Sequence, residues 1–444
     1  MTLRSPAIEK LVHLARDREL GPFIELARHV EPADLADVLA ALADGERLRV
    51  VRALPPELSA EALVEIDPSI TTEMMVALPP STAAGIVEEL SDDDAADVIG
   101  ELEPEQQEAI LREVEDRADV ERLLSYDEKS AGGLMTTEVV AVGDGLSAVE
   151  AIDAVRRMAD EVGDFYTVFV TDDQGRLVGE LALKDLVLAA PARPVREIMT
   201  PPIGTVSPEE DQEEVARTLQ RYNVPALAVT DPQGRLLGRI TFDDVADVIE
   251  EEATEDILRF GGTSGDEELG ARWEDAVRSR LPWLCVNLLT AFVAGAVVLA
   301  FQDVVSRIVV LSAWMPIIAG MGGNAGTQAL AVTVRRLALG LIPAGQAVRV
   351  VTKEALVGVI NGLANGIITA LAAVALGQGW KLGVVVFMAM TGNLLVAGLA
   401  GAFIPIILEK FDVDPAIASS IFVTTFTDVC GFGLLLGLSS ALLL

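Results

Sequence analysis

The sequence predicts a multidomain protein: an all-α superhelical domain, an α/β domain built from two similar halves, and an α-helical membrane domain with five transmembrane helices. Its 444 residues suit about three domains of ordinary size. Residues 1–272 contain 24 Lys and Arg against 60 Asp and Glu, whereas residues 273–444 contain 9 against 8. The chain therefore joins a strongly acidic part to a nearly neutral, apolar one.

A 12-residue repeat predicts the fold of the first domain, residues 1–130. Its five copies begin at Leu54, Ile66, Leu78, Leu90 and Leu102. Each copy has a Pro, Ser or Asp that favours the start of a helix, followed by about two turns of amphipathic sequence. Short helices stacked as a superhelix explain a fixed period best.

A duplicated motif predicts the second domain, residues 131–245. The sequence DQGRLVG at 173–179 recurs as PQGRLLG at 232–238, and each copy follows an apolar strand-like run. A helical stretch precedes each strand, and each half opens with Met-Thr, at Met135 and Met199. The order of helix, strand, glycine turn, strand and helix, found twice, resembles a tandem pair of CBS modules.

That resemblance implies a regulatory nucleotide. CBS pairs commonly bind adenine nucleotides such as ATP, with a Thr or Ser and an Asp three residues later holding the ribose. Thr241 and Asp244 fit this pattern in the second copy, whereas Ala182 stands in place of the hydroxyl in the first. The alternative is that Asp244 acts together with the acidic residues that follow it in the chain.

Residues 246–272 connect this domain to the membrane part. No Pro or Gly interrupts the chain from Asp243 until Gly261, which predicts one continuous helix. Carboxylates three and four residues apart share its faces, and such like charges destabilise a helix unless cations lie between them. The two groups are Asp244, Asp247 and Glu251, and Glu252, Glu255 and Asp256. We interpret the helix as a cation sensor; a solvated charged face is the simpler alternative.

Five apolar runs near the length of about 20 residues that a spanning helix needs predict the membrane domain, residues 273–444. They cover about 281–301, 308–332, 352–377, 382–408 and 415–441. Among the flanking basic residues only Arg307 and Lys381 lie on the side opposite the amino terminus. The positive-inside rule therefore predicts a multi-pass protein of the cytoplasmic membrane, with a cytosolic amino terminus and an extracytoplasmic carboxyl terminus. Residues 1–20 show no export signal.

Two features mark a candidate path through the membrane. Asp428 lies deep in the last apolar run, where a charge costs at least about 2.5 kcal/mol unless water, a partner or an ion solvates it. Residues 316–328 hold four glycines together with Asn324, Thr327 and Gln328. Such a stretch allows either close helix packing or a loosened backbone that turns its carbonyls toward water. Histidines are absent from the membrane part, so hard oxygen ligands for Mg²⁺, Ca²⁺ or Mn²⁺ are favoured.

Five motifs together resemble the MgtE family of magnesium channels. They are AGGLMT at 131–136, EATEDI at 252–257, GGNAGTQ at 322–328, DPA at 414–416 and TDVCG at 427–431. The resemblance implies a homodimer with a helical amino-terminal domain, a CBS pair, an acidic plug helix and five spans per subunit. It also implies that Asp428 faces the pore on the two-fold axis and binds hydrated Mg²⁺.

Further site residues follow from the same resemblance. The pore would include Gly320, Gly323, Asn324 and Thr327. The regulatory magnesium sites would include Glu61, Asp93, Asp97, Glu213, Asp244, Asp247, Glu252, Glu255, Asp256 and Asp414. Thr327 replaces an Asn found in many members, and Asn223 stands where others have an acidic residue.

The sequence thus predicts a Mg²⁺-selective channel or transporter for magnesium uptake, closed by cytosolic Mg²⁺, with no enzymatic activity and no nucleic-acid partner. A Na⁺- or H⁺-coupled divalent cation exchanger is the alternative, although no second carboxylate near the midplane and no inverted repeat supports it. A nucleotide sensor anchored in the membrane is a third reading. An anchor would need neither Asp428 nor the glycine-rich stretch.

Overall fold

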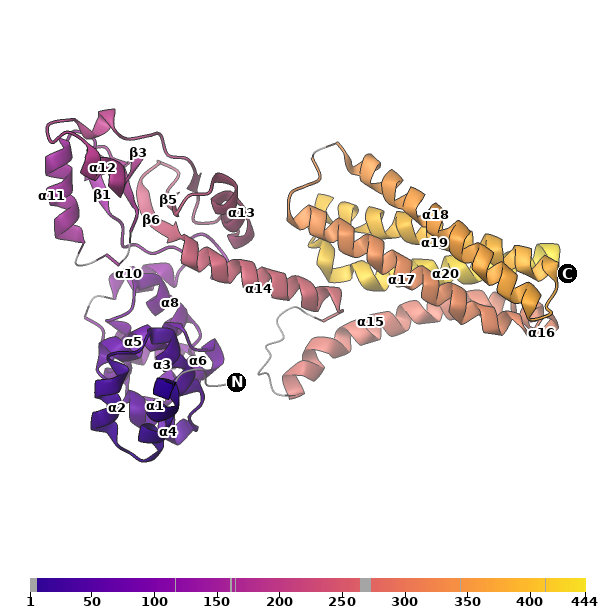
Figure 1. Cartoon of the computed structure of the whole chain (residues 1–444), viewed down its shortest axis with the longest axis horizontal. Helices are drawn as coiled ribbons and strands as arrows, with labels where there is room; N and C mark the ends of the chain where they lie inside the picture. The colour runs from indigo at the N-terminus through magenta and orange to yellow at the C-terminus, as the bar shows by residue number, and fades with distance from the viewer. Residues whose placement is uncertain are drawn as a thin grey trace. The chain divides into compact units, whose positions relative to one another are not determined.

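The computed structural model describes residues 6–115, 117–159, 162–163, 165–263, 273–343, 345–411 and 413–444. Two compact units divide the chain, Met1–Glu250 and Glu251–Leu444, and each is described by itself. Residues 264–272 of the predicted connecting segment lie outside the described residues. Figure 1 shows the course of the chain.

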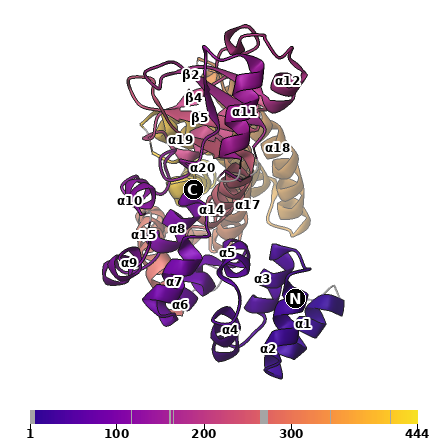
Figure 2. The ribbon, with the colours of Figure 1, turned by 90° about the vertical axis from the view of Figure 1, so that its left-hand side faces the viewer.

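Short helices form the first part of unit 1 (Figure 2). They are α1 (Pro6–Arg16), α2 (Leu20–Ala27), α3 (Pro32–Ala40), α4 (Asp44–Val51), α5 (Pro56–Val64), α6 (Pro68–Ala77), α7 (Pro80–Val87), α8 (Asp92–Gly100), α9 (Pro104–Leu111) and α10 (Ala118–Leu123). Each copy of the 12-residue repeat supplies one helix, from α5 to α9, and four of these five have Pro in the first turn. Alternate helices pack on each other, as α5 does on α7 and α6 on α8. The predicted helical domain is confirmed.

Two three-stranded sheets form the rest of unit 1. In the first, β1 (Ala141–Gly143) runs parallel to β2 (Thr167–Thr171), which pairs antiparallel with β3 (Leu177–Ala182). In the second, β4 (Thr205–Val206), β5 (Ala226–Thr230) and β6 (Leu236–Thr241) repeat this order. The helices are α11 (Ala148–Met158), α12 (Leu183–Leu188), α13 (Gln212–Tyr222) and a 3-10 turn, η1 (Val195–Glu197).

The two glycine turns join the sheets to each other. Gly175 and Gly234 have φ angles of +76° and +79°, which favour glycine. The backbone N–H of Leu177 donates to the Gly234 carbonyl at 2.9 Å, and the N–H of Leu236 donates to the Gly175 carbonyl at 3.1 Å. The sequence duplication is therefore a structural one, and the predicted CBS pair is confirmed.

The predicted continuous helix is also confirmed. It is α14 (Phe242–Phe260), which begins directly after β6 and ends before Gly261 and Gly262. Gly262 has a φ of +85°, a conformation that ends helices at little cost.

Long helices make up most of unit 2: α15 (Trp273–Ala300), α17 (Leu311–Ala338), α18 (Ala347–Ala375), α19 (Trp380–Lys410) and α20 (Pro415–Leu442), with the short α16 (Gln302–Arg307). Within the described residues, four helices are long and apolar enough to cross a membrane: α15, α18, α19 and α20 from Ser420. The expectation of five spans is therefore not confirmed. The helix that falls short is α17, which matches α15 in length but carries the glycine-rich, amide-bearing stretch that lowers its hydropathy.

Candidate pore and cation-binding sites

The three helices α17, α19 and α20 meet around a buried asparagine. Asn393 of α19 has no exposed surface, and its side-chain Nδ2 donates to the Ile318 carbonyl of α17 at 2.9 Å. A Cβ added to Gly322 would lie 3.0 Å from Cγ of Asn393 and 3.0 Å from Cβ of Thr427 in α20. Gly322 thus permits the close approach of three helices, as small residues do in membrane bundles.

The glycine-rich stretch does not loosen the backbone. The helix α17 is unbroken from Leu311 to Ala338, so the expectation of carbonyls freed by a loosened segment is not met. Gly322 and Gly326 serve packing, since Gly326 also faces α20, with its added Cβ 3.7 Å from Cγ2 of Thr427. Gly320 and Gly323 differ from them: a Cβ at Gly320 would meet no described atom within 4 Å.

Gly323 faces the side of α20 that also carries Asp428. A Cβ at Gly323 would lie 3.7 Å from Cγ2 of Thr424, and Thr424 and Asp428 are four residues apart on one helix face. Of the other predicted pore residues, Asn324 is exposed and Thr327 is half-buried. The fold therefore brings Gly323 to the face of α20 predicted to line a path.

Asp428 is half-buried and forms no hydrogen bond or ion pair with any described residue. Within the described ranges, no three His, Cys, Asp or Glu side chains come together as a group that could enclose a metal ion. A single subunit thus offers one carboxylate to the predicted path, which suits a cation that keeps its water shell better than one stripped bare.

Carboxylates from α8, the start of α14 and the segment before β1 lie near enough in unit 1 to repel one another, although no three of them are close enough to enclose one metal ion directly. We call this group the acidic cluster: Asp93, Asp94, Asp97, Glu138 and Asp244. Ser91 donates its hydroxyl to Asp94 at 2.6 Å, and Thr241 donates its hydroxyl and its N–H to Asp244 at 2.6 and 3.1 Å. Oδ1 of Asp93 is buried and has no hydrogen-bond partner.

Burial and mutual repulsion raise the pKa values in the acidic cluster. Burial raises the pKa of Asp97 to about 8, and the neighbouring Asp93 and Asp94 add to this. Burial, with repulsion from Asp93, raises the pKa of Asp244 to about 7 against the lowering effect of Thr241. The pKa of Glu138 rises to about 7 and that of Asp93 to about 6, again mainly through burial. A cation would relieve this repulsion.

Three other predicted regulatory residues of unit 1 are not members of the acidic cluster. Asp247 contributes repulsion to Asp94, so it lies near the acidic cluster. Glu61 is exposed on α5. Glu213 of α13 forms an ion pair with Arg217 at 2.6 Å. The cluster therefore includes Asp93, Asp97 and Asp244, and the contacts of Glu213 include a cationic side chain.

In unit 2, an arginine joins the predicted regulatory carboxylates. Arg259, in the last turn of α14, forms ion pairs with Glu255 of the same helix and with Asp414, the residue before α20. Burial raises the pKa of Asp256, with added repulsion from Asp414 and Glu252. Arg259 was not among the predicted site residues, although its position four residues after Glu255 signals a helical ion pair.

Sequence reasoning missed other residues as well. Asp94 and Glu138 were not singled out; the run of three aspartates at 92–94 was a signal for the first, but nothing around Glu138 marks it. Glu354 of α18 is buried, 6% exposed, with Lys353 Nζ 3.1 Å from its carboxylate. It lies in the second turn of α18, near the end of the candidate span.

A cavity of about 660 Å³ lies beside the first CBS sheet. Tyr166, Glu180, Lys184, Asp185 and Thr200 are among the residues that line it. The predicted nucleotide residues Thr241 and Asp244 do not line this cavity and hydrogen-bond to each other instead. This cavity thus adjoins the copy that lacks the expected hydroxyl.

Comparisons with known proteins agree along the chain. Residues 30–129 match the MgtE intracellular N domain, residues 131–192 and 195–251 match the CBS domain, and residues 315–438 match MgtE, a divalent cation transporter family. Two solved structures resemble the first part: the soluble part of a magnesium transporter and the cytosolic domain of the Mg²⁺ channel MgtE in complex with ATP. The first has a TM-score of 0.52, is 27% identical and covers 56% of this chain and 98% of its own. The second has a TM-score of 0.52, is 37% identical and covers 54% and 99%.

Three curated relatives that match most of the chain are named magnesium transporter MgtE. The protein from Thermus thermophilus is 39% identical over 74% of this chain and 73% of its own length. The protein from Enterococcus faecalis is 34% identical over 71% and 69%, and that from Bacillus subtilis is 31% identical over 72% and 71%. These names confirm the expectation of transport in place of enzymatic catalysis. With its helical domain, CBS pair and apolar helices in the same order, the chain belongs to the MgtE family of divalent cation transporters.

Proposed function

We propose that this protein carries Mg²⁺ into the cell and is closed by Mg²⁺ bound to its cytosolic side. The observation that carries the proposal is the acidic cluster, in which buried carboxylates of α8 and of the start of α14 lie near enough to repel one another. The magnesium transporters named among its relatives support the choice of ion. The domains 1–130, 131–245, 246–272 and 273–444 would then act as sensor, nucleotide-binding module, connecting plug and pore.

Transport would depend on Asp428. In a homodimer with two-fold symmetry, one Asp per chain places two carboxylates opposite each other, and their charge balances one divalent ion. Because Mg²⁺ gives up water reluctantly, the pair would hold it through its hydration shell. A Cβ added to Gly320 would meet no described atom within 4 Å, and one added to Gly323 would meet only Cγ2 of Thr424, at 3.7 Å. These two glycines would line the path beside Asp428.

Closure would use the carboxylates of the cytosolic side. Without Mg²⁺, repulsion among Asp93, Asp97 and Asp244 opposes the packing of α8 against the start of α14. Mg²⁺ between them would stabilise the compact form and hold α14 in place, as would Mg²⁺ near Glu252 and Asp256. The ion gates the pore only if it binds the closed form more tightly than the open one. Transport would thus limit itself as cytosolic Mg²⁺ rises.

ATP would act as a regulatory ligand of the CBS pair. A solved relative's cytosolic domain is in complex with ATP. The 660 Å³ cavity is large enough for a nucleotide. The ammonium of Lys184, which lines it, would bind the phosphates. Binding of ribose at Thr241 and Asp244 would have to replace their mutual hydrogen bond.

The protein would lie in the cytoplasmic membrane with the acidic part in the cytosol. An uptake assay tests this function: purified protein in liposomes, an imposed inside-negative potential, and a Mg²⁺-sensitive dye inside. Uptake that follows the potential without a sodium or proton gradient supports the proposal. Uptake that requires either gradient would favour the exchanger, and a protein without uptake would be a membrane-anchored sensor.

A further inference from the structure

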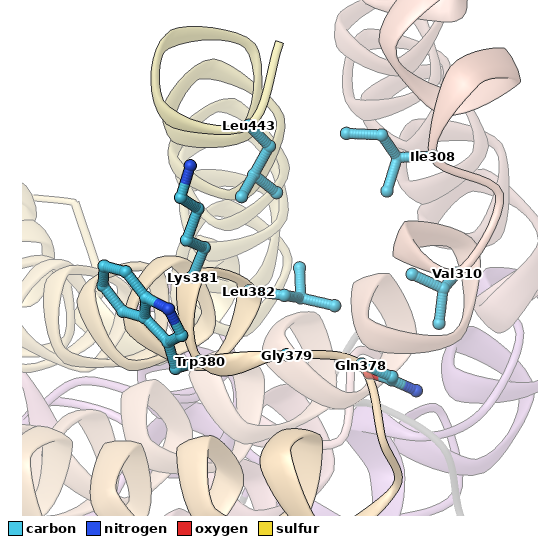
Figure 3. Close-up of a pocket in the computed structure, with 8 residues that line it drawn as sticks. All are labelled: Ile308, Val310, Gln378, Gly379, Trp380, Lys381, Leu382 and Leu443. Atoms are coloured by element: carbon cyan, nitrogen blue, oxygen red, sulfur yellow. The ribbon is translucent and has the colours of Figure 1, made fainter.

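A cavity of about 480 Å³ lies in unit 2, where the loop before α17, the start of α19 and the end of α20 meet (Figure 3). One part of its wall is aliphatic, formed by Ile308, Val310, Leu382 and Leu443. Two polar side chains also line it, Lys381 and Gln378. Figure 3 shows Lys381 at one end of the cavity, beside the indole of Trp380 and near Leu443, and Gln378 apart from it, with Leu382 between them.

The polar groups of this cavity are hydrogen-bond donors. Lys381 is exposed, and its ammonium forms no ion pair with any residue in the described part of the chain. The Oε1 atom of Gln378 accepts a hydrogen bond from Nε1 of the buried Trp314 at 2.8 Å, which leaves the –NH₂ group of the amide as its free end. A ligand group that suits the Lys381 ammonium has acceptor oxygens and a negative charge.

The cavity lies at the ends of the membrane helices. The candidate span α18 ends at Ala375, α19 begins at Trp380 and α20 ends at Leu442. Trp380 is 69% exposed, as expected for the amphipathic indoles that gather where lipid headgroups meet the hydrocarbon. The cavity therefore opens at the depth of the lipid headgroups, with its aliphatic wall on the adjoining helices.

We propose that this cavity binds an anionic phospholipid. The phosphate would lie against the Lys381 ammonium at one end of the cavity, and an acyl chain would cover Ile308, Val310 and Leu382. A small soluble anion would leave the aliphatic wall unused, and an uncharged hydrocarbon would leave Lys381 without a counter-charge. Neither matches the division of the wall into a cationic part and an apolar part.

Quenching of Trp380 by brominated lipids tests the proposal on the full chain in liposomes. The probes are phosphatidylglycerol and phosphatidylcholine brominated on the acyl chain. The emission of Trp380 is obtained as the difference between proteins that are identical except for Trp380→Phe. We expect half-maximal quenching at about fivefold less brominated phosphatidylglycerol than phosphatidylcholine, because one Lys near a lipid surface contributes about 1 kcal/mol.

Two charge-removing variants separate a built site from general surface charge. Lys381→Gln should abolish the preference for phosphatidylglycerol. Arg307→Gln removes a positive charge at the end of α16, beside Ile308 in the sequence but outside the cavity wall, and should retain the preference. Equal quenching by the two lipids in the unmodified background, or loss of the preference in Arg307→Gln as well as in Lys381→Gln, would overturn the proposal.

Discussion

Arg259, in the last turn of α14, forms an ion pair with Asp414, which immediately precedes α20. The two residues are 155 positions apart in the sequence. The same guanidinium also pairs with Glu255. Asp428 lies 14 residues after Asp414, about 21 Å along α20 at the rise of an α-helix. An ion pair thus joins the connecting helix α14 to the residue that directly precedes the helix carrying the candidate pore carboxylate.

Replacing Arg259 should weaken closure. In Arg259→Gln, Glu255 and Asp414 lose their shared guanidinium, so the link between α14 and α20 is weaker and depends more on Mg²⁺. We expect the cytosolic-side Mg²⁺ concentration that halves the flux to rise about threefold, in keeping with a partly exposed ion pair. Arg278→Gln is the control, since its pair with Asp275 lies at the exposed start of α15. An unchanged half-inhibitory concentration in Arg259→Gln would exclude this role.

Removing one carboxylate from the acidic cluster should have opposite effects with and without Mg²⁺. At about pH 9, where Asp97 is ionised, Asp97→Asn relieves repulsion, so the metal-free protein should unfold at a higher temperature than the unmodified one. The stabilisation gained on adding Mg²⁺ should fall, by about 1.4 kcal/mol for each tenfold loss of affinity. Thermal unfolding of the full chain in detergent measures both. Glu105→Gln, an exposed change on α9, should alter neither, and equal Mg²⁺ stabilisation in Asp97→Asn and Glu105→Gln would count against the site.

The raised pKa values predict how stability depends on pH. Asp93, Asp97, Glu138 and Asp244 have folded pKa values of about 6, 8, 7 and 7, above the ordinary values of 3.8 to 4.5. The folded, metal-free protein therefore holds more protons than the unfolded chain between about pH 4 and pH 8, so its stability falls as the pH rises through that window.

Mg²⁺ would displace those protons from the acidic cluster. In weak buffer at about pH 7, addition of Mg²⁺ to the full chain should release protons, and at about pH 9, where the carboxyls are already ionised, it should release almost none. Mg²⁺ affinity should fall toward about pH 5. A pH electrode or calorimetry in two buffers of different ionisation enthalpy measures the release. Binding without proton release at pH 7 would place the ion elsewhere.

Two glycines on α17 offer a matched pair for testing the packing of the bundle. Gly322→Ala adds a Cβ 3.0 Å from Cγ of Asn393 and 3.0 Å from Cβ of Thr427, whereas Gly320→Ala adds one with no described atom within 4 Å. Gly322→Ala should destabilise the protein by about 1–3 kcal/mol, the usual cost of overpacking. Gly320→Ala should leave the unfolding temperature in detergent unchanged. Similar unfolding temperatures for the two variants would contradict the packing described here.

Local signals account for what the sequence predicted correctly. Helices α5 to α9 followed from Pro or Asp at each helix start, and α14 followed from a long stretch without Gly or Pro. The duplicated glycine turns identified the two sheets because each turn needs a positive φ. These features depend on near neighbours in the chain, which a sequence displays directly.

Features that depend on distant neighbours were predicted less well. The pair of Arg259 with Asp414 forms only in the folded protein, and Glu138 joins the acidic cluster through the tertiary fold. The glycines of α17 allowed two interpretations, close helix packing or a loosened backbone. The position of Asn393 on another helix decided in favour of packing at Gly322. The fifth predicted span, at α17, is not confirmed because a helix that packs through glycines and amides need not be apolar along its whole length.

The flux of Mg²⁺ through Asp428→Asn tests the central claim most directly. Under an imposed inside-negative potential, with no Mg²⁺ at the cytosolic face, the rate of uptake by this variant should be at least about tenfold lower. The reason is that the two carboxylates that offset the cost of a cation in the membrane are gone. Asp303→Asn, which neutralises an exposed carboxylate on α16, should transport normally. Unimpaired uptake by Asp428→Asn would contradict the assignment of Asp428 to the pore.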